Sequence, residues 1–209
     1  MATEEKNMEE IILQKAEELF LEKDFASVST TQIAREVGCN QALVHYYFRT
    51  KEKLFSAVFE SKFKIFSESL LPIFGKKELP FMDRIKEVVA GHFDILKVHP
   101  TIPRFILNEL SGNSQRRKML VEKFKSLSQQ LYTDLQKELD EEYAKGNIVE
   151  MRAIDLMLDI VLLNVSAFVT FPLASEIFHH YSAVENYLES RKQENIKLII
   201  CRLINRESI

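Results

Sequence analysis

The chain has little glycine, proline or cysteine and no tryptophan. Its 209 residues include five glycines, five prolines and two cysteines. So few turn-forming residues exclude a turn-rich β protein and favour long helices joined by short connections. The cysteines, Cys39 and Cys201, lie far apart and lack metal-ligand spacing, so neither a disulfide framework nor a zinc site is expected.

Nothing in the sequence is typical of a secretory signal or a good membrane span. The first ten residues are acidic and polar, the opposite of a signal peptide. The longest apolar stretch, 156–173, is interrupted by Asp159, Asn164 and Pro172, which makes it a poor membrane helix. We therefore expect a cytoplasmic protein with no membrane partner.

The formal net charge of −3 argues weakly against a nucleic-acid partner, but the charges are unevenly distributed. Residues 1–30 carry three lysines against eight acidic residues, whereas residues 31–64 carry six basic side chains against three acidic ones. An excess of positive charge therefore begins in the second segment. Solvated helix faces often carry such runs, so charge alone does not decide for DNA.

Apolar residues recur at helical spacing along the chain, and no alternating strand pattern of useful length occurs. The sequence therefore predicts an all-α protein of about nine helices. Breaks are expected at 72–80, which begins at Pro72, and at Pro172. The first predicted helix ends at about residue 23. The other predicted helices span about 30–37, 41–48, 51–71, 81–98, 101–111, 114–144, 150–173 and 183–205.

Residues 29–48 have the pattern of two short helices joined by a tight turn. Ser29 and Gln32 form a capping-box pattern at the start of the first, and Gly38 suits its left-handed end. Asn40 can cap the second. Two helices joined by a three-residue turn around a glycine are typical of a helix-turn-helix, whose second helix enters the major groove of DNA.

The second short helix has an inward and an outward face. Val44, Tyr47 and Phe48 form the inward arc at spacings of three and four. The side chains left available to DNA are Gln41, Ala42, Leu43, His45 and Tyr46. A glutamine can form paired hydrogen bonds with an adenine edge, and apolar side chains can contact a thymine methyl. His45 and Tyr46 suit phosphates or a single base edge.

Lys51 lies in the first turn of the next helix, where the helix dipole disfavours a cation. A DNA phosphate there would contact both the free backbone amides and the ammonium group. Taken alone, the residue is better interpreted as a solvated lysine. Its place directly after the helix-turn-helix favours the phosphate contact.

A resemblance to the DNA-binding domain of TetR-family repressors runs through three segments: Gln32-Ile-Ala-Arg-Glu-Val-Gly38, Asn40-Gln-Ala-Leu-Val-His-Tyr-Tyr-Phe48 and Lys51-Glu-Lys-Leu54. It covers about residues 8–60, and the rest of the chain is similar to the family only in length and helical pattern. The resemblance implies a helix-turn-helix DNA-binding domain at 1–52. A larger helical domain for effector binding and dimerisation is then expected at 53–209.

By matched position, the resemblance implies DNA contacts from both short helices and from the start of the next one. Base contacts are expected from Gln41, Ala42 and Leu43. Contacts with phosphates or the DNA backbone are expected from Thr30, Thr31, Tyr46, Tyr47 and Lys51, with His45 completing the set. The chain departs from the family at His45, where a tyrosine is usual, and at Leu43, where a small hydroxyl residue is usual.

The resemblance further implies a repressor that a small effector releases from a palindromic operator. The aromatic and aliphatic content of the chain indicates that this effector is apolar. A homodimer is expected, because two recognition helices must reach major grooves about 34 Å apart. The last two long helices have broad apolar content and could form a four-helix interface with their symmetry mates. Their candidate interface residues are Leu156, Ile160, Leu163, Ala167, Phe171, Leu188, Ile196, Ile199, Ile200 and Leu203.

An effector pocket is expected among the middle helices, again by resemblance. Its candidate lining residues are Phe93, Phe105, Met119, Phe124 and Phe168. Such residues at helical spacing more often belong to an ordinary core.

Other functions stay open at this point. A similar protein could activate transcription or act without a ligand, and a helical enzyme or scaffold is a different class. The sequence holds no nucleophile elbow, phosphate-binding glycine loop or metal constellation, so we expect neither an enzyme nor a cofactor. His179 and His180 point in different directions on a helix and are not expected to bind a metal.

Overall fold

The computed structural model describes residues 2–23, 25–103, 107, 114–177 and 184–204. Within these residues every regular element is a helix, which confirms the all-α prediction. The helices are α1 (Ala2–Glu22), α2 (Thr30–Val37), α3 (Gln41–Phe48), α4 (Lys51–Phe74), α5 (Phe81–Val98), α7 (Ser114–Ala144), α8 (Ala153–Ile177) and α9 (Val184–Ile204).

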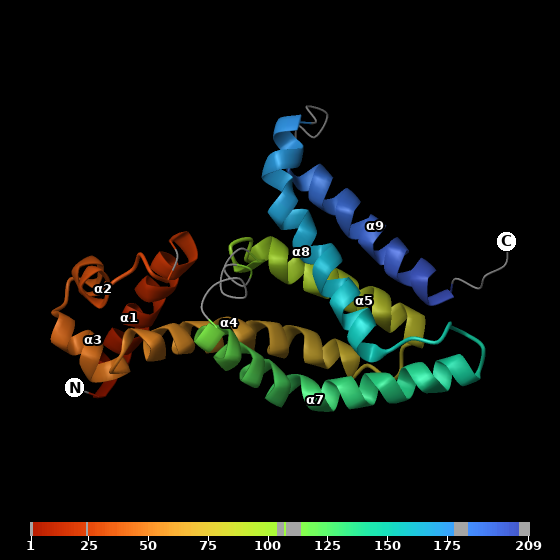
Figure 1. Ribbon diagram of the computed structural model, residues 1–209, viewed down its shortest axis with the longest axis horizontal. Helices are drawn as coiled ribbons and strands as arrows, with labels where there is room; N and C mark the ends of the chain where they lie inside the picture. The colour runs from red at the N-terminus through yellow and green to blue at the C-terminus, as the bar shows by residue number, and fades with distance from the viewer. Residues whose placement is uncertain (1, 24, 104–106, 108–113, 178–183, 205–209) are drawn as a thin grey trace.

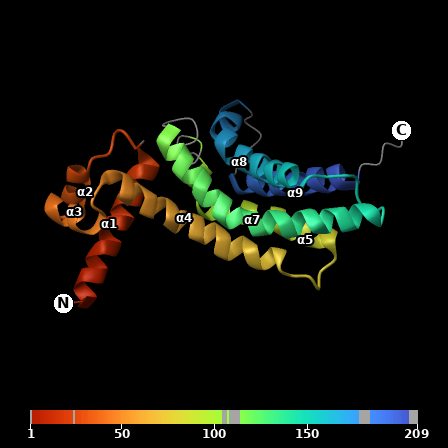
Figure 2. The same cartoon turned by 60° about the horizontal axis from the view of Figure 1, so that its bottom comes forward.

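The molecule is elongated, with two groups of helices joined by α4. Figure 1 shows α1, α2 and α3 gathered at one end, while α4 leads from them toward α5, α7, α8 and α9. The same arrangement is visible in Figure 2, where α4 and α7 run along one side of the second group. We call residues 8–59 the head and residues 73–204 the body, after the two sets of buried side chains that they contain.

Polar caps set the bounds of the short helices in the head. The Ser29 hydroxyl accepts a hydrogen bond from the Gln32 amide at 3.0 Å, and the Asn40 side-chain oxygen accepts one from the Leu43 amide at 2.8 Å. Gly38 ends α2 in the left-handed conformation, with φ at 78°. The cap residues predicted from the sequence are therefore confirmed.

The core of the head is closed and apolar. Phe55 of α4 is fully buried, with its ring 5.3 Å from that of Phe20 and 5.1 Å from that of Phe25. Buried aromatic rings at these distances contribute both apolar area and edge-to-face contacts. The whole cluster comprises Ile12, Ala16, Leu19, Phe20, Phe25, Val28, Ile33, Ala34, Val44, Phe48, Leu54, Phe55, Val58 and Phe59.

Helix α4 belongs to both groups. Its first turns bury Leu54 and Phe55 in the head, and its last residues, Ile73 and Phe74, pack against the core of the body. The break expected at 72–80 is present between α4 and α5, but it begins after Phe74 and not at Pro72. A proline removes only one amide donor, and in this last turn the Gly75 amide still bonds to the Leu71 carbonyl at 3.2 Å.

The body packs α5, α8 and α9 against one another, and α7 against α8. Its main core includes Ile85 of α5, Leu139 of α7, Leu156 of α8 and Ile199 of α9. The break expected at Pro172 is wrong, since α8 runs on to Ile177. Pro172 lacks the amide hydrogen that would donate a helical hydrogen bond, and the helix continues past it nevertheless.

A polar junction is buried at the centre of the body. The Asn164 side-chain amide donates to the Val89 carbonyl at 2.9 Å and lies 3.0 Å from His92 Nδ1. The Asn195 amide donates to Asn164 Oδ1 at 2.9 Å, and Arg191 donates to Asn195 Oδ1 at 3.0 Å. These bonds tie α5, α8 and α9 together. Burial lowers the pKa of His92 to about 4, so its imidazole is neutral at physiological pH.

Helix α8 has an apolar face that no described residue covers. By length and composition alone it could cross a membrane. Two of its polar side chains have partners within the body, however. Asn164 lies in the buried junction, and Asp159 Oδ2 lies 2.8 Å from Arg202 Nε. The exposed apolar residues of α8 are Ile154, Leu158, Val161, Leu162, Val169, Leu173 and Ile177.

Most of the residues that the sequence singled out for dimerisation lie on the inner faces of α8 and α9. Leu156, Ile160 and Ala167 are buried within the body, as are Leu188, Ile199 and Leu203 of α9. The physical reason is that α8 is apolar all round, so composition did not distinguish its inner face from its outer one.

Candidate nucleic-acid interface

Helix α3 presents a polar face to solvent above an apolar anchor. Val44 and Phe48 are buried in the head, which confirms the inward positions predicted for them. On the other side Gln41, His45 and Tyr46 are exposed, and Tyr46 retains 60% of its accessible surface. A rigid helix with exposed polar side chains on one face is what readout of a DNA groove requires.

The other predicted base-contact residues differ in exposure. Ala42 is exposed, whereas Leu43 is half-buried and packs against the core of the head. Only part of the Leu43 side chain therefore remains available to a thymine methyl.

A chain of hydrogen-bond contacts runs along the exposed face of α3. Gln41 Nε2 lies 3.0 Å from the Thr30 hydroxyl of α2 and 3.2 Å from His45 Nε2. The other ring nitrogen of His45, Nδ1, lies 2.9 Å from the Arg49 carbonyl oxygen. Thr30, Gln41 and His45, which the sequence predicted as separate DNA contacts, are thus linked to one another.

Arg49 forms the turn between α3 and α4. It has a positive φ of 63° and a ψ of −55°, and the Thr50 amide bonds to the Phe48 carbonyl at 2.6 Å. Those values describe a γ-turn of the rare, strained type. Thr50 then caps α4, its hydroxyl accepting from the Lys53 amide at 3.2 Å. Sequence reasoning missed Arg49, because its contact with His45 is made by the backbone carbonyl, which every residue has.

The remaining predicted contact residues surround this face. Thr31 is exposed at the start of α2, and Tyr47 is half-buried with its ring 5.1 Å from that of Tyr46. Lys51 Nζ lies 4.1 Å from the centroid of the Phe25 ring at the start of α4. Lys51 is the first residue of α4, directly after the Thr50 cap, and a lysine at a helix start can contact a phosphate bound there. Burial raises the pKa of the Cys39 thiol, so this residue adds no charge beside α3.

The predicted effector residues are only partly described. Phe93 is buried, and its ring centroid lies 5.0 Å from that of Phe168. Phe105 lies outside the described residues, as do His179 and His180, and the side chains of Met119 and Phe124 on α7 are not described either. The structure thus brings together Phe93 and Phe168 from α5 and α8.

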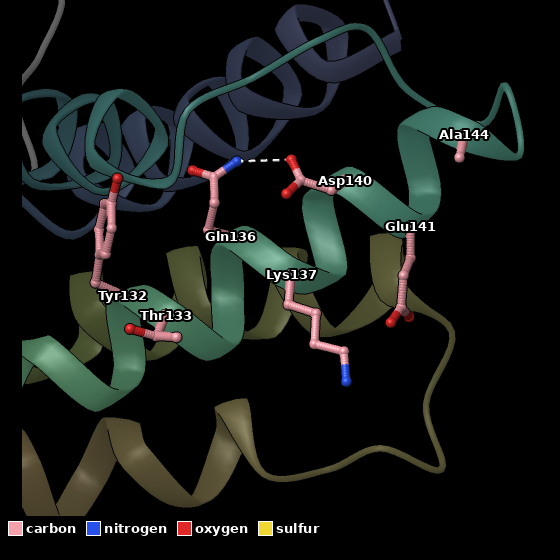
Figure 3. A pocket seen from close by; sticks show the side chains of 7 residues that line it. All are labelled: Tyr132, Thr133, Gln136, Lys137, Asp140, Glu141 and Ala144. Carbon is pink, nitrogen blue, oxygen red and sulfur yellow. Dashed lines mark hydrogen bonds between the residues drawn. The ribbon is translucent and has the colours of Figure 1, made fainter.

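A hollow of about 530 Å³ lies elsewhere, along the surface of α7 (Figure 3). Its lining residues are Tyr132, Thr133, Gln136, Lys137, Asp140, Glu141 and Ala144. They all belong to a single helix, and the Gln136 amide donates to Asp140 at 2.9 Å. None of the predicted effector residues lines this open hollow. In the part of the chain described here, no group of three or more histidine, cysteine or acidic side chains is placed to hold a metal ion.

Comparison with known proteins points to one family. Residues 12–58 match the family of bacterial regulatory proteins named after tetR. A nucleoid occlusion factor, SlmA of Mannheimia succiniciproducens, is 29% identical over 89 residues, which are 42% of this chain and 40% of that protein. The chain therefore matches about two fifths of the length of this curated relative.

Two solved structures share the fold over nearly the whole chain. HlyIIR, a hemolysin II transcriptional regulator, superposes with a TM-score of 0.64 at 20% identity, covering 97% of this chain and 99% of that one. FadR of Bacillus subtilis, solved with stearoyl-CoA, gives a TM-score of 0.69 at 18% identity, covering 92% and 98%. The helix-turn-helix segment thus matches the tetR family of bacterial regulatory proteins, and the chain as a whole has the fold of these solved regulators.

Proposed function

We propose that the protein is a transcriptional repressor that binds a palindromic DNA operator through α3. The observation that carries this proposal is the exposed polar face of α3, which stands on the buried anchor of Val44 and Phe48. Gln41 and Ala42 contact bases together with the exposed part of Leu43, and His45 supports Gln41 in this contact. The other predicted residues contact phosphates. The proposed DNA-binding residues are Thr30, Thr31, Gln41, Ala42, Leu43, His45, Tyr46, Tyr47 and Lys51.

The test is selection of bound duplexes from genomic fragments, followed by affinity measurements on the recovered operator. Gln41→Ala removes a base contact, so it relaxes sequence preference and costs about 1–3 kcal/mol at one base pair. Lys51→Ala removes a phosphate contact, so it weakens all duplexes alike and lowers the salt dependence of binding. Identical behaviour of the two variants would show that the division into base and phosphate contacts is wrong.

Failure to bind any genomic fragment at low salt, the protein's own promoter region included, would contradict DNA binding itself. A reporter gene placed behind the recovered operator separates repression from activation. Repression requires lower expression when the protein is present.

The protein acts as a homodimer through α8 and α9. Support comes from the uncovered apolar face of α8, to which Leu198 and Ile204 of α9 add exposed apolar side chains. A second copy of the same face would cover these residues and set two α3 helices at the spacing of successive major grooves. The fold and the DNA partner both agree with a cytoplasmic location.

We further propose that the DNA-binding domain corresponds to residues 1–52 and the effector-binding and dimerisation domain to 53–209. Helix α4 begins at that boundary and connects the two. Because its start packs in the head and its end packs in the body, a shift of α4 would change the separation of the two heads in a dimer.

The effector is small and apolar, and it binds in the body beside Phe93 and Phe168, with Phe105, Met119 and Phe124 as the other proposed contacts. Support comes from the aromatic character of this region and from a fold relative solved with stearoyl-CoA. Fatty acids and acyl thioesters of several chain lengths are suitable probes. A true effector lowers operator affinity, and Phe168→Ala should weaken that response while leaving ligand-free DNA binding intact.

A further inference from the structure

The side-chain amide of Gln41 directs both of its hydrogens toward neighbouring side chains of the protein. Nε2 lies within hydrogen-bond distance of the Thr30 hydroxyl, at 3.0 Å, and of His45 Nε2, at 3.2 Å. An amide nitrogen can only donate, so each of these partners must accept. Two acceptors use both hydrogens of the amide.

The acceptor role of His45 Nε2 follows from its other nitrogen. Nδ1 lies 2.9 Å from the Arg49 carbonyl oxygen, which can only accept, so Nδ1 carries a hydrogen. A neutral imidazole has a single N–H, and Nε2 is then free to accept from Gln41. The strained turn at Arg49 places this carbonyl next to His45 and thereby selects the tautomer.

The amide oxygen of Gln41 is left as the group that can contact DNA. In the described part of the chain Oε1 has no hydrogen-bond partner, and the residue is exposed at the leading end of α3. An outward acceptor can bond to the N6 amino group of adenine or the N4 amino group of cytosine. Guanine and thymine present only acceptors at the corresponding places in the major groove.

We propose that His45, together with Thr30, is a positioning residue that makes Gln41 a hydrogen-bond acceptor toward the bases. The protein then selects adenine or cytosine at the contacted position. A glutamine without these internal bonds could also donate to adenine N7 and so prefer adenine alone. This inference rests on the proposed DNA binding, because it concerns how the same face reads a base.

The first experiment needs no DNA. Long-range proton–nitrogen correlation spectra of the ¹⁵N-histidine-labelled protein, at a pH where imidazoles are neutral, report which ring nitrogen carries the hydrogen. The His45 signal is assigned by its loss in His45→Asn. We expect the Nδ1–H tautomer, whereas Nε2–H would overturn the proposal.

The second experiment selects duplexes from a randomised pool and compares matched variants at the base pair whose preference disappears in Gln41→Ala. The wild type should select adenine and cytosine over guanine and thymine. His45→Asn keeps a donor for the Arg49 carbonyl but loses the acceptor for Gln41. The ratio of adenine to cytosine should therefore rise by roughly three- to tenfold, as one amide hydrogen becomes available for N7.

Conservative variants test the same bonds. His45→Gln can still offer an acceptor to Gln41 and should resemble the wild type. Thr30→Val should shift the ratio as His45→Asn does, whereas Thr30→Ser should not. In the Gln41→Ala background none of these changes should alter base preference at that position, because His45 and Thr30 act through Gln41.

The outcomes separate the two proposals. A wild type that selects adenine alone, or a His45→Asn effect that persists without Gln41, overturns the positioning role and leaves DNA binding standing. A wild type that selects no duplex overturns the proposed function and with it the specificity role, and the tautomer measurement still reports whether the internal bonds exist.

Discussion

The head and the body distribute polar and apolar side chains in opposite ways. The core of the head is made of apolar residues, and its polar groups, such as Gln41 and His45, lie on the outside of α3. The body buries His92, Asn164 and Asn195 at its centre and leaves an apolar face of α8 exposed.

This difference indicates what each part is built to bind. The head satisfies its own hydrophobic requirement and offers hydrogen-bonding groups, which suits a polar partner such as DNA. The body exposes large apolar side chains next to one another on α8, and such surfaces are normally covered in the working protein. A second copy would cover them, and the buried polar junction would keep α5, α8 and α9 in register beneath that interface.

The largest effect is expected from Phe55→Ala. Removing a fully buried ring that contacts Phe20 and Phe25 should lower the free energy of unfolding by about 3–5 kcal/mol, since the cavity cannot fully collapse. Urea unfolding gives the total, and hydrogen exchange should show the loss of protection concentrated in the head. Phe93→Ala is the matched change in the body. If each variant lowered hydrogen-exchange protection equally in the head and in the body, the two cores would not be separate.

The polar junction predicts a pH dependence that arises in the body alone. Because burial lowers the pKa of His92 from 6.5 to about 4, the unfolded chain binds the proton first as the pH falls. The free energy of unfolding should therefore decrease by roughly 3 kcal/mol between pH 6.5 and pH 4, with no further contribution from His92 below that.

His92→Asn supplies the control, because an asparagine oxygen can still accept the bond from Asn164 but does not titrate. The contribution of His92 is the difference between the two stability curves, in which other titrating groups cancel. Parallel curves over this pH range would contradict a buried neutral imidazole.

A smaller effect, on assembly, is expected from Leu162→Glu. The leucine is 61% exposed at the centre of the apolar face of α8, so a carboxylate there would be desolvated in a dimer. We expect the dimer dissociation constant to rise by about a hundredfold, close to 3 kcal/mol, as measured by sedimentation. Val98→Glu changes an apolar residue that is 72% exposed on α5 and should leave assembly unaltered. Equal effects of the two variants would mean that α8 is not the interface.

The fold of the head could be predicted because its signals are local. Ser29, Gly38 and Asn40 act on amides and carbonyls within a few residues, so the bounds of α2 and the start of α3 follow from the sequence alone. The link between Gln41 and His45 is also local, at a spacing of four, but its donor and acceptor roles depend on the turn at Arg49. No propensity rule predicts a positive φ at an arginine.

The body was less predictable because its decisive contacts are distant in sequence. Asn164 is 72 residues from His92 and 31 from Asn195, and nothing along the chain pairs them. The sequence did not separate the inner face of α8 from its outer face for a related reason: an apolar sequence without helical periodicity does not specify which side packs inward. Packing of α5 and α9 against α8 makes that choice.

The smallest effect concerns how far the head extends along α4. Lys62 of α4 forms an ion pair with Glu17 of α1, and the side chains are only 11% and 22% exposed. Lys62→Met should lower the free energy of unfolding by about 1 kcal/mol, because a partly buried carboxylate loses its partner. Lys64→Met removes a lysine that is 71% exposed two residues later and should change stability by less than about 0.5 kcal/mol. If Lys62→Met also raises hydrogen exchange in α1, the head extends along α4 through Lys62, which lies one turn past the apolar core of the head. If both variants are neutral, that core alone holds α4 to the head, and the rest of α4 moves with the body.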